Sequence, residues 1–141
     1  MRILLGIIIA FIILFIAARL YTAFGVPAPR NLGVNNGQLI PCPDTPNCVS
    51  TQAPSTDAEH FMPSIPYTSD ASFAMTQILR AVSSMPRATV IKQVDTYLHA
   101  EFRSRMMGFA DDVEFYLDDA NKLIHFRSAS RLGQGDMGVN R

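Results

Sequence analysis

The sequence has no excess of charge of either sign, with 12 Lys and Arg residues against 12 Asp and Glu residues. Affinity for nucleic-acid phosphates comes mainly from a basic excess, so this balance argues against a nucleic-acid-binding protein. Cysteine is also scarce, with two residues that allow at most one disulfide. No Cys-x-x-Cys motif or His pair accompanies them, which disfavours a zinc site. We therefore expect neither a metal nor a cofactor.

Motifs that would identify a reaction are missing as well. No Gly-rich phosphate loop precedes a helix, and the acidic residues show neither EF-hand nor facial-triad spacing. His99 or His125 with Ser128 or Ser130 would supply a base and a nucleophile, but no nucleophile-elbow motif surrounds either serine. An enzyme that uses Asp, Glu or His in acid–base chemistry is therefore the alternative to a binding function.

One long apolar run is present near the N-terminus. Residues 3–18 contain no polar side chain, and Arg19 follows them. A membrane-spanning helix needs about 20 residues, and snorkelling of Arg19 to the headgroups extends the usable span to Phe24. We predict a transmembrane signal-anchor in residues 1–25 that contacts the lipid bilayer through residues 3–24.

Two other interpretations of this run remain open. Ala23-Phe24-Gly25 is an acceptable cleavage site for a signal peptide, although Arg19 separates it from the apolar run. A buried helix of a soluble protein is disfavoured because the segment is apolar on all sides. The arginines on the two flanks are nearly balanced, so the positive-inside rule does not predict the orientation. The cysteines are therefore the remaining indication of which side of the membrane the rest of the chain occupies.

Residues 26–66, here called the strap, hold eight of the nine prolines. Proline lacks a backbone donor and clashes with the preceding turn, so most of this segment is not helical. Leu39, Val49 and Phe61 are among the apolar residues that favour a strap packed partly against the domain.

Cys42 and Cys48 lie within the strap, with turn-forming residues between them. A disulfide between them would close a small loop, contribute about 2 kcal/mol, and persist only in an oxidising compartment. The alternative is two free thiols facing the cytoplasm. An anchor followed by this pair favours a single-pass protein of the inner (plasma) membrane with its C-terminal domain in the periplasm.

The remaining residues, 67–141, are predicted to form an α+β domain. Thr68-Ser69-Asp70 supplies helix-capping side chains, and the helix ends before Pro86. Its apolar residues at helical spacing are Met75, Ile78, Leu79 and Val82. Alternating apolar and polar residues then predict about four antiparallel strands with the helix packed on one face of their sheet. The predicted strands are residues 89–94, 97–105, 111–118 and 123–130.

The turn positions predict which charged residues face one another. A tight turn at residues 119–122 places Glu114 opposite Arg127, and a turn near residues 107–110 places Glu114 opposite Arg103. Glu114 would then lie between two arginines on the polar, outward face. The alternative is an ordinary solvated surface, on which such pairs contribute little to stability.

Polar residues are unusually dense after residue 110, and glycines punctuate the last part of that stretch, a pattern often found at binding clefts. The candidate ligand-binding residues are Arg103, Asp111, Asp112, Glu114, Arg127, Ser128, Ser130, Arg131 and Asn140.

Four short segments resemble the "domain of unknown function 1499" family. In order, they are Pro46-Asn47-Cys48-Val49-Ser50, Asp111-Asp112-Val113-Glu114-Phe115, Arg127-Ser128-Ala129-Ser130-Arg131 and Gly138-Val139-Asn140-Arg141. The resemblance covers about Gly37 to Arg141. It implies a secreted, lumenal or membrane-anchored domain, and it implies no activity.

The sequence therefore favours a membrane-anchored extracytoplasmic domain that binds a small polar ligand or a membrane partner protein through an Arg-, Asp- and Glu-rich cleft. The alternatives are an envelope enzyme and a structural accessory subunit of a membrane complex. Exposure of the apolar connection at residues 106–109 would favour a partner protein.

Overall fold

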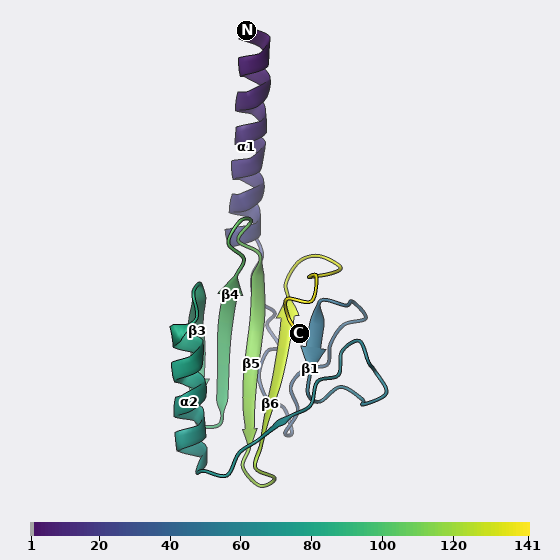
Figure 1. The fold of residues 1–141 in the computed structure, drawn as a ribbon, viewed down its shortest axis with the longest axis vertical. Coiled ribbons are helices and arrows are strands. Elements are labelled where there is room, and N and C mark those ends of the chain that lie inside the picture. The colour runs from purple at the N-terminus through teal and green to yellow at the C-terminus, as the bar shows by residue number, and fades with distance from the viewer. Residues whose placement is uncertain (1) are drawn as a thin grey trace.

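The computed structural model describes residues 2–141. It is an α+β fold, in which a helix packs on an antiparallel sheet and a long apolar helix projects from one end of that sheet (Figure 1). The elements are α1 (Arg2–Phe24), β1 (Cys48–Ser50), β2 (Ile65–Pro66), α2 (Ala71–Ser84), β3 (Ala88–Val94), β4 (Tyr97–Arg103), β5 (Ala110–Asp118) and β6 (Leu123–Ser130).

Helix α1 contains the apolar run. Its 23 residues extend over roughly 34 Å at the α-helical rise of 1.5 Å per residue. The helix is long and apolar enough to cross a membrane, and its apolar window is exposed rather than buried in the domain. This exposure argues against a core helix of a soluble protein. Its last turns contact the rest of the chain, and Thr22 is buried there against the loop between β4 and β5.

Helix α2 begins and packs as the sequence predicts. Asp70 is its N-cap, and the side chain accepts a hydrogen bond of 2.8 Å from the backbone N–H of Phe73. The helix ends at Ser84, before Pro86, as predicted. The buried residues of the core under this helix are Ala74, Met75, Val82, Leu98, Ala100, Leu117 and Ile124.

The sheet has six strands rather than about four. Its order is β1-β6-β5-β4-β3, and β2 also pairs with β6. The two additional strands come from the strap and are 3 and 2 residues long. Segments this short show no periodicity in sequence, and they become strands because β6 offers them an unpaired edge.

The predicted register is confirmed between β5 and β6 and wrong between β4 and β5. Glu114 faces Arg127 as expected. On its other side, however, Glu114 faces His99, whereas Arg103 faces Ala110. The reason is the connection, which leaves the sheet at Ser104 and closes through a 2.9 Å hydrogen bond from the Ser104 N–H to the Phe109 carbonyl. The hairpin is therefore centred earlier in the chain than the predicted turn.

The strap covers the face of the sheet opposite α2. The Gly33 N–H donates to a Glu114 carboxylate oxygen, and Arg131 donates to the Val26 carbonyl. The expectation that this charged face points to solvent is therefore wrong, because Glu114 and Asp112 are 0% and 1% exposed. The structure also joins Cys42 to Cys48 through a disulfide within the strap.

Candidate functional site

The sheet divides the predicted site residues into two clusters. Successive residues of a strand point to opposite faces, so Asp111 and Asp112 cannot line one cleft. The strap face carries Arg103, Asp112, Glu114, Arg127 and Arg131, whereas the α2 face carries Asp111, Ser128 and Ser130, joined there by Asn140 of the C-terminal segment.

Asp112 and Arg131 form the centre of the strap-face cluster. The guanidinium donates two hydrogen bonds to the carboxylate, with Nε–Oδ2 and Nη2–Oδ1 distances of 2.8 and 2.7 Å. Arg131 Nη1 also lies 2.7 Å from a Glu101 carboxylate oxygen. His99 Nε2 completes the network at 2.8 Å from Asp112 Oδ1. Such bidentate, charge-assisted contacts are among the strong hydrogen bonds in proteins.

These contacts decide the charge of Asp112. Burial on its own would raise the pKa of this carboxyl, but the hydrogen bonds from Arg131 and His99 outweigh burial and hold the pKa at about 2. The hydrogen bond to Asp112 in turn raises the pKa of Arg131. The two side chains are therefore a charged pair at neutral pH.

Glu114 and Arg127 form a second, looser ion pair beside the first. Glu114 Oε1 accepts hydrogen bonds of 2.7 Å from the Tyr97 hydroxyl and from the Gly33 N–H. Its Oε2 lies 3.7 Å from Arg127 Nη1, and neither Oε2 nor Arg127 Nε has a hydrogen-bond partner among residues 2–141. Burial lowers the pKa of Arg127. The pKa of Tyr97 is raised, mainly by burial and also by its hydrogen bond to Glu114. The pair is thus fully enclosed and incompletely satisfied.

The strap-face cluster binds the protein's own backbone. Its contacts beyond the sheet go to the Gly33 N–H, the Val26 carbonyl and, from Arg103, the carbonyls of Ala23 and Gly108. Asp112, Glu114 and Arg127 are nearly inaccessible, whereas the Arg103 side chain at the edge of the cluster is 30% exposed. We conclude that it fixes the strap to the sheet.

The histidine and serine residues considered as a base and a nucleophile do not meet. His99 and His125 lie on the strap face, whereas Ser128 and Ser130 lie on the α2 face. Within residues 2–141, no group of three or more His, Cys, Asp or Glu side chains is arranged to hold a metal ion.

Arg103 does not face Glu114, contrary to the predicted register. Its Nε lies 2.6 Å from a Glu101 carboxylate oxygen. Its Nη1 donates to the carbonyls of Ala23 and Gly108. Arg103 therefore joins the sheet to the end of α1 and makes no contact with Glu114.

Asn140 connects the C-terminal segment to the α2 face of β6. The Ser128 hydroxyl donates to its side-chain oxygen, and its side-chain amide donates to Ser130 Oγ at 3.0 Å and to Asp136 Oδ2 at 2.7 Å. The segment after β6 is thereby held beside Asp111.

Asp111 is the one predicted acidic residue that has no ion-pair partner within residues 2–141. Two small cavities, of about 150 and 160 Å³, both include it in their lining. Burial raises the pKa of its carboxyl, and a hydrogen bond with Ser130 opposes that rise. A mostly enclosed carboxylate beside empty space is a candidate binding group.

Sequence reasoning missed several members of these clusters. Alternation along the predicted strand 97–105 is enough to put Tyr97 and His99 on one face, but it does not make them partners of Glu114 and Asp112, because the predicted β4–β5 register is wrong. Gly33 had no signal at all, because only the folded strap brings it to Glu114.

Comparison with known families identifies the domain. A family model described as "Protein of unknown function (DUF1499)" matches residues 38–141. The chain belongs to the DUF1499 family. The match begins after α1, so membership in DUF1499 concerns the sheet domain and most of the strap, and not the apolar helix. No curated protein and no solved structure matches the chain.

The four segments that carry the DUF1499 resemblance meet at one corner of the sheet. The segment with Cys48 forms β1 and pairs with β6, which pairs with β5. The Ser130 N–H donates to the Asn47 carbonyl at 3.0 Å, and the Asn140 side chain donates to the same carbonyl at 3.2 Å. Asp111, opposite Ser130 on β5, lies at this corner. Segments far apart in the DUF1499 sequence thus surround the candidate carboxylate.

Proposed function

We propose that this DUF1499 protein is a single-pass inner-membrane protein whose C-terminal domain lies in the periplasm and binds a small polar ligand at Asp111. Residues 1–25 act as the signal-anchor, residues 26–66 as the strap, and residues 67–141 as the binding domain. The observation that carries the binding role is the Asp111 carboxylate, which forms no ion pair within residues 2–141 and lines two cavities at the corner where the family segments meet.

The chemistry around Asp111 restricts the ligand. The carboxylate accepts hydrogen bonds and favours positive charge, while Phe102, Val113 and Val139 line the same cavities with apolar surface. A small ligand with an ammonium group and a short apolar part would satisfy both. The free energy gained would come from giving a cationic partner to a carboxylate that is hydrogen-bonded to Ser130 but forms no ion pair within residues 2–141.

The compartment is supported by two independent features. Helix α1 is long and apolar enough to span a bilayer. The Cys42–Cys48 disulfide favours an oxidising environment for the domain that follows it.

Reporter fusions to Arg141 test the topology. We expect activity from a reporter that works only in the periplasm, and none from a reporter that works only in the cytoplasm. Non-reducing mass spectrometry of protein taken from its own membrane should give a mass lower than that of the dithiol by the thiol hydrogens. A cytoplasmic signal alone would overturn the orientation. Free thiols at Cys42 and Cys48 would remove the support that the disulfide gives to a periplasmic location.

Replacement of Asp111 tests the binding site. Small molecules that co-purify with the full-length protein in detergent are identified by mass spectrometry. We expect at least one to be lost from Asp111→Asn, because the neutral amide cannot attract a cation, and to be retained by Asp95→Asn. Asp95 is a matched control, since it lies in the exposed turn between β3 and β4, where Asn tolerates its positive φ. A ligand that stays bound to Asp111→Asn, or no ligand on the unmodified protein, would contradict the proposal.

A further inference from the structure

The end of α1 packs against the loop between β4 and β5. Arg19 Nη1 donates to the Met106 carbonyl at 2.6 Å, and the Thr22 hydroxyl donates to the Met107 carbonyl. Gly108 makes this approach possible, because its φ is +73° and an added Cβ would lie 3.2 Å from Ala23 Cβ. The apolar loop, whose exposure would favour a partner protein, contacts the protein's own helix through its backbone, while the side chains of Met106 and Phe109 stay exposed.

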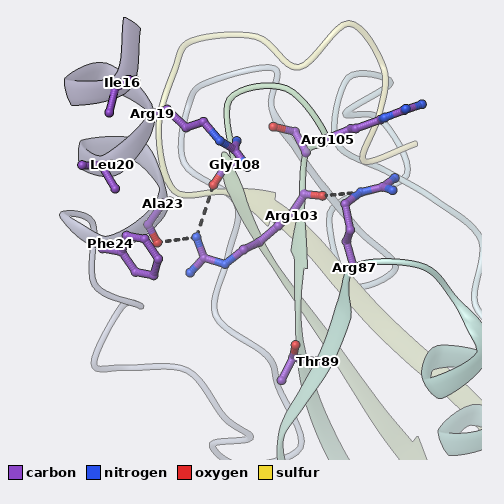
Figure 2. Close-up of a pocket in the computed structure, with 11 residues that line it drawn as sticks. Ile16, Arg19, Leu20, Ala23, Phe24, Arg87, Thr89, Arg103, Arg105 and Gly108 are labelled. Atoms are coloured by element: carbon purple, nitrogen blue, oxygen red, sulfur yellow. Dashed lines mark hydrogen bonds between the residues drawn. The ribbon is translucent and has the colours of Figure 1, made fainter. Parts of the chain in front are cut away.

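A cavity of about 560 Å³ lies between this helix end and the sheet edge formed by β3 and β4. Apolar residues Ile16, Leu20 and Phe24 of α1 line one part of it (Figure 2). The other lining residues include four arginines, namely Arg19, Arg87, Arg103 and Arg105. In Figure 2, Arg103 reaches toward Ala23 of α1, and Arg87 and Arg105 lie on the side of Arg103 away from the helix. The cavity volume lies within the range typical of small-molecule sites.

The charge of this cavity is strongly positive. Glu101 is the only acidic residue that forms an ion pair with a lining arginine within residues 2–141, and it is already shared between Arg103 and Arg131 at 2.6 and 2.7 Å. Arg19, Arg87 and Arg105 have no ion-pair partner in the part of the chain that the structure describes. Guanidinium groups match phosphate oxygens in geometry, so the occupant should carry a phosphate or a similar anion.

The position of the cavity along α1 indicates an occupant that is also apolar. Arg19 is the first charged residue after the apolar run, so it lies where that run leaves the hydrocarbon of a bilayer. Ile16 and Leu20 then border the acyl-chain region, and Arg87 and Arg105 border the aqueous side. A phospholipid has the same order of groups along its length, from acyl chain to phosphate.

We propose that this cavity binds an anionic phospholipid, with the phosphate and headgroup at the arginines and an acyl chain along Ile16 and Leu20. The lipid comes from the leaflet that holds the C-terminal end of α1. The site rests on the membrane anchor of the proposed function, and it depends neither on the periplasmic orientation nor on the ligand at Asp111. Bound lipid would fix the angle between the anchor and the domain.

Native mass spectrometry of the full-length protein tests the site. The protein is released from micelles that contain equal amounts of phosphatidylglycerol and phosphatidylcholine. The bound molecules of each lipid are then counted from the mass of the complex. We expect selective retention of phosphatidylglycerol. The double variant Arg87→Gln/Arg105→Gln should lose this selectivity by roughly 30-fold, because each arginine near a membrane surface contributes about fivefold.

The double variant should keep its fold, because both arginines are exposed. The Arg87 side chain donates one hydrogen bond, of 3.0 Å, to the Arg103 carbonyl. The Arg105 side chain forms no ion pair within residues 2–141. A change in lipid selectivity therefore reports the charge of the cavity rather than unfolding.

Two control variants show whether the effect belongs to this cavity. Arg80→Gln, which removes an exposed arginine of α2 outside the cavity, should behave like the unmodified protein. Asp111→Asn should also keep its phosphatidylglycerol, so that failure at Asp111 does not affect the result here. Equal retention of both lipids by the unmodified protein, or unchanged selectivity in the double variant, would overturn the proposal. Displacement of the lipid by excess inorganic phosphate would also overturn it, since the site would then recognise the free anion.

Discussion

Arg131→Ala is expected to lower the free energy of unfolding by about 3–5 kcal/mol, because it leaves a buried carboxylate without its cation. Arg131 holds Asp112 with two hydrogen bonds and also contacts Glu101 and the Val26 carbonyl. The measurement is chemical denaturation of the full-length protein in detergent micelles at neutral pH. Arg80→Ala, at an exposed position of α2, is the control and should change stability by less than about 0.5 kcal/mol.

The pH dependence of this loss distinguishes an ion pair from simple packing. The pKa of Asp112 is about 2 in the folded protein, against 3.8 for an ordinary aspartate. The unfolded chain therefore binds a proton first as the pH falls, and the stability that Asp112 contributes, about 2 kcal/mol, is present above about pH 4 and is lost between about pH 4 and pH 2. The difference between Arg131→Ala and the unmodified protein should shrink over the same interval. A difference that is equal at about pH 6 and about pH 2, or one below about 1 kcal/mol at neutral pH, would contradict the role given to this pair.

The parts of the structure that sequence reasoning obtained correctly are those that local chemistry determines. Asp70 caps α2 because its carboxylate accepts a hydrogen bond from the Phe73 N–H, which has no partner within the helix. The β5–β6 register follows from the tight turn at residues 119–122, where Lys122 adopts a φ of 55°. In both cases the deciding residues are within a few positions of one another.

The parts that it missed depend on contacts between distant segments. Glu114 alternates with apolar residues in the way that an exposed charged face does, and nothing near it in sequence shows that Gly33 will cover it. The β4–β5 register differs from the predicted one because the connection closes between Ser104 and Phe109, and this loop then packs against Ala23, which is far away in the chain. The candidate ligand-binding residues were therefore identified as a group, whereas their division between two faces of the sheet needed the structure.

The charged residues on the two faces of the sheet have different surroundings. On the strap face, each charge has a partner in the chain or is enclosed by it, which is the arrangement of a structural network. On the α2 face, Asp111 has no cationic partner within residues 2–141 and adjoins two cavities. If Asp111 binds the ligand as proposed, binding and stability can be separated by mutation, because Asp112 and Glu114 lie in the buried network on the other face.

Glu114→Gln is expected to destabilise the domain by about 3–5 kcal/mol, because it leaves the Arg127 guanidinium buried without a counter-charge. The Gln side chain can still accept hydrogen bonds from Tyr97 and Gly33, so the loss reports the charge rather than the shape. Arg127→Met should cost less, because a carboxylate left alone can take up a proton, whereas a guanidinium cannot lose one under these conditions. Both variants are measured by denaturation alongside Arg80→Ala.

The double variant Glu114→Gln/Arg127→Met decides between a buried ion pair and two independent packing contacts. It removes both charges while keeping similar side-chain volumes, and replacement of a buried pair by uncharged groups is often neutral or stabilising. We expect it to regain more than half of the stability lost in Glu114→Gln, and to keep the Gly33 N–H protected from hydrogen exchange because the Gln oxygen still accepts its bond. Losses that simply add would mean that the two side chains do not interact. Rapid exchange at Gly33 in the double variant, but not in the unmodified protein, would show that the strap depends on the charge of Glu114 and not on its hydrogen bond.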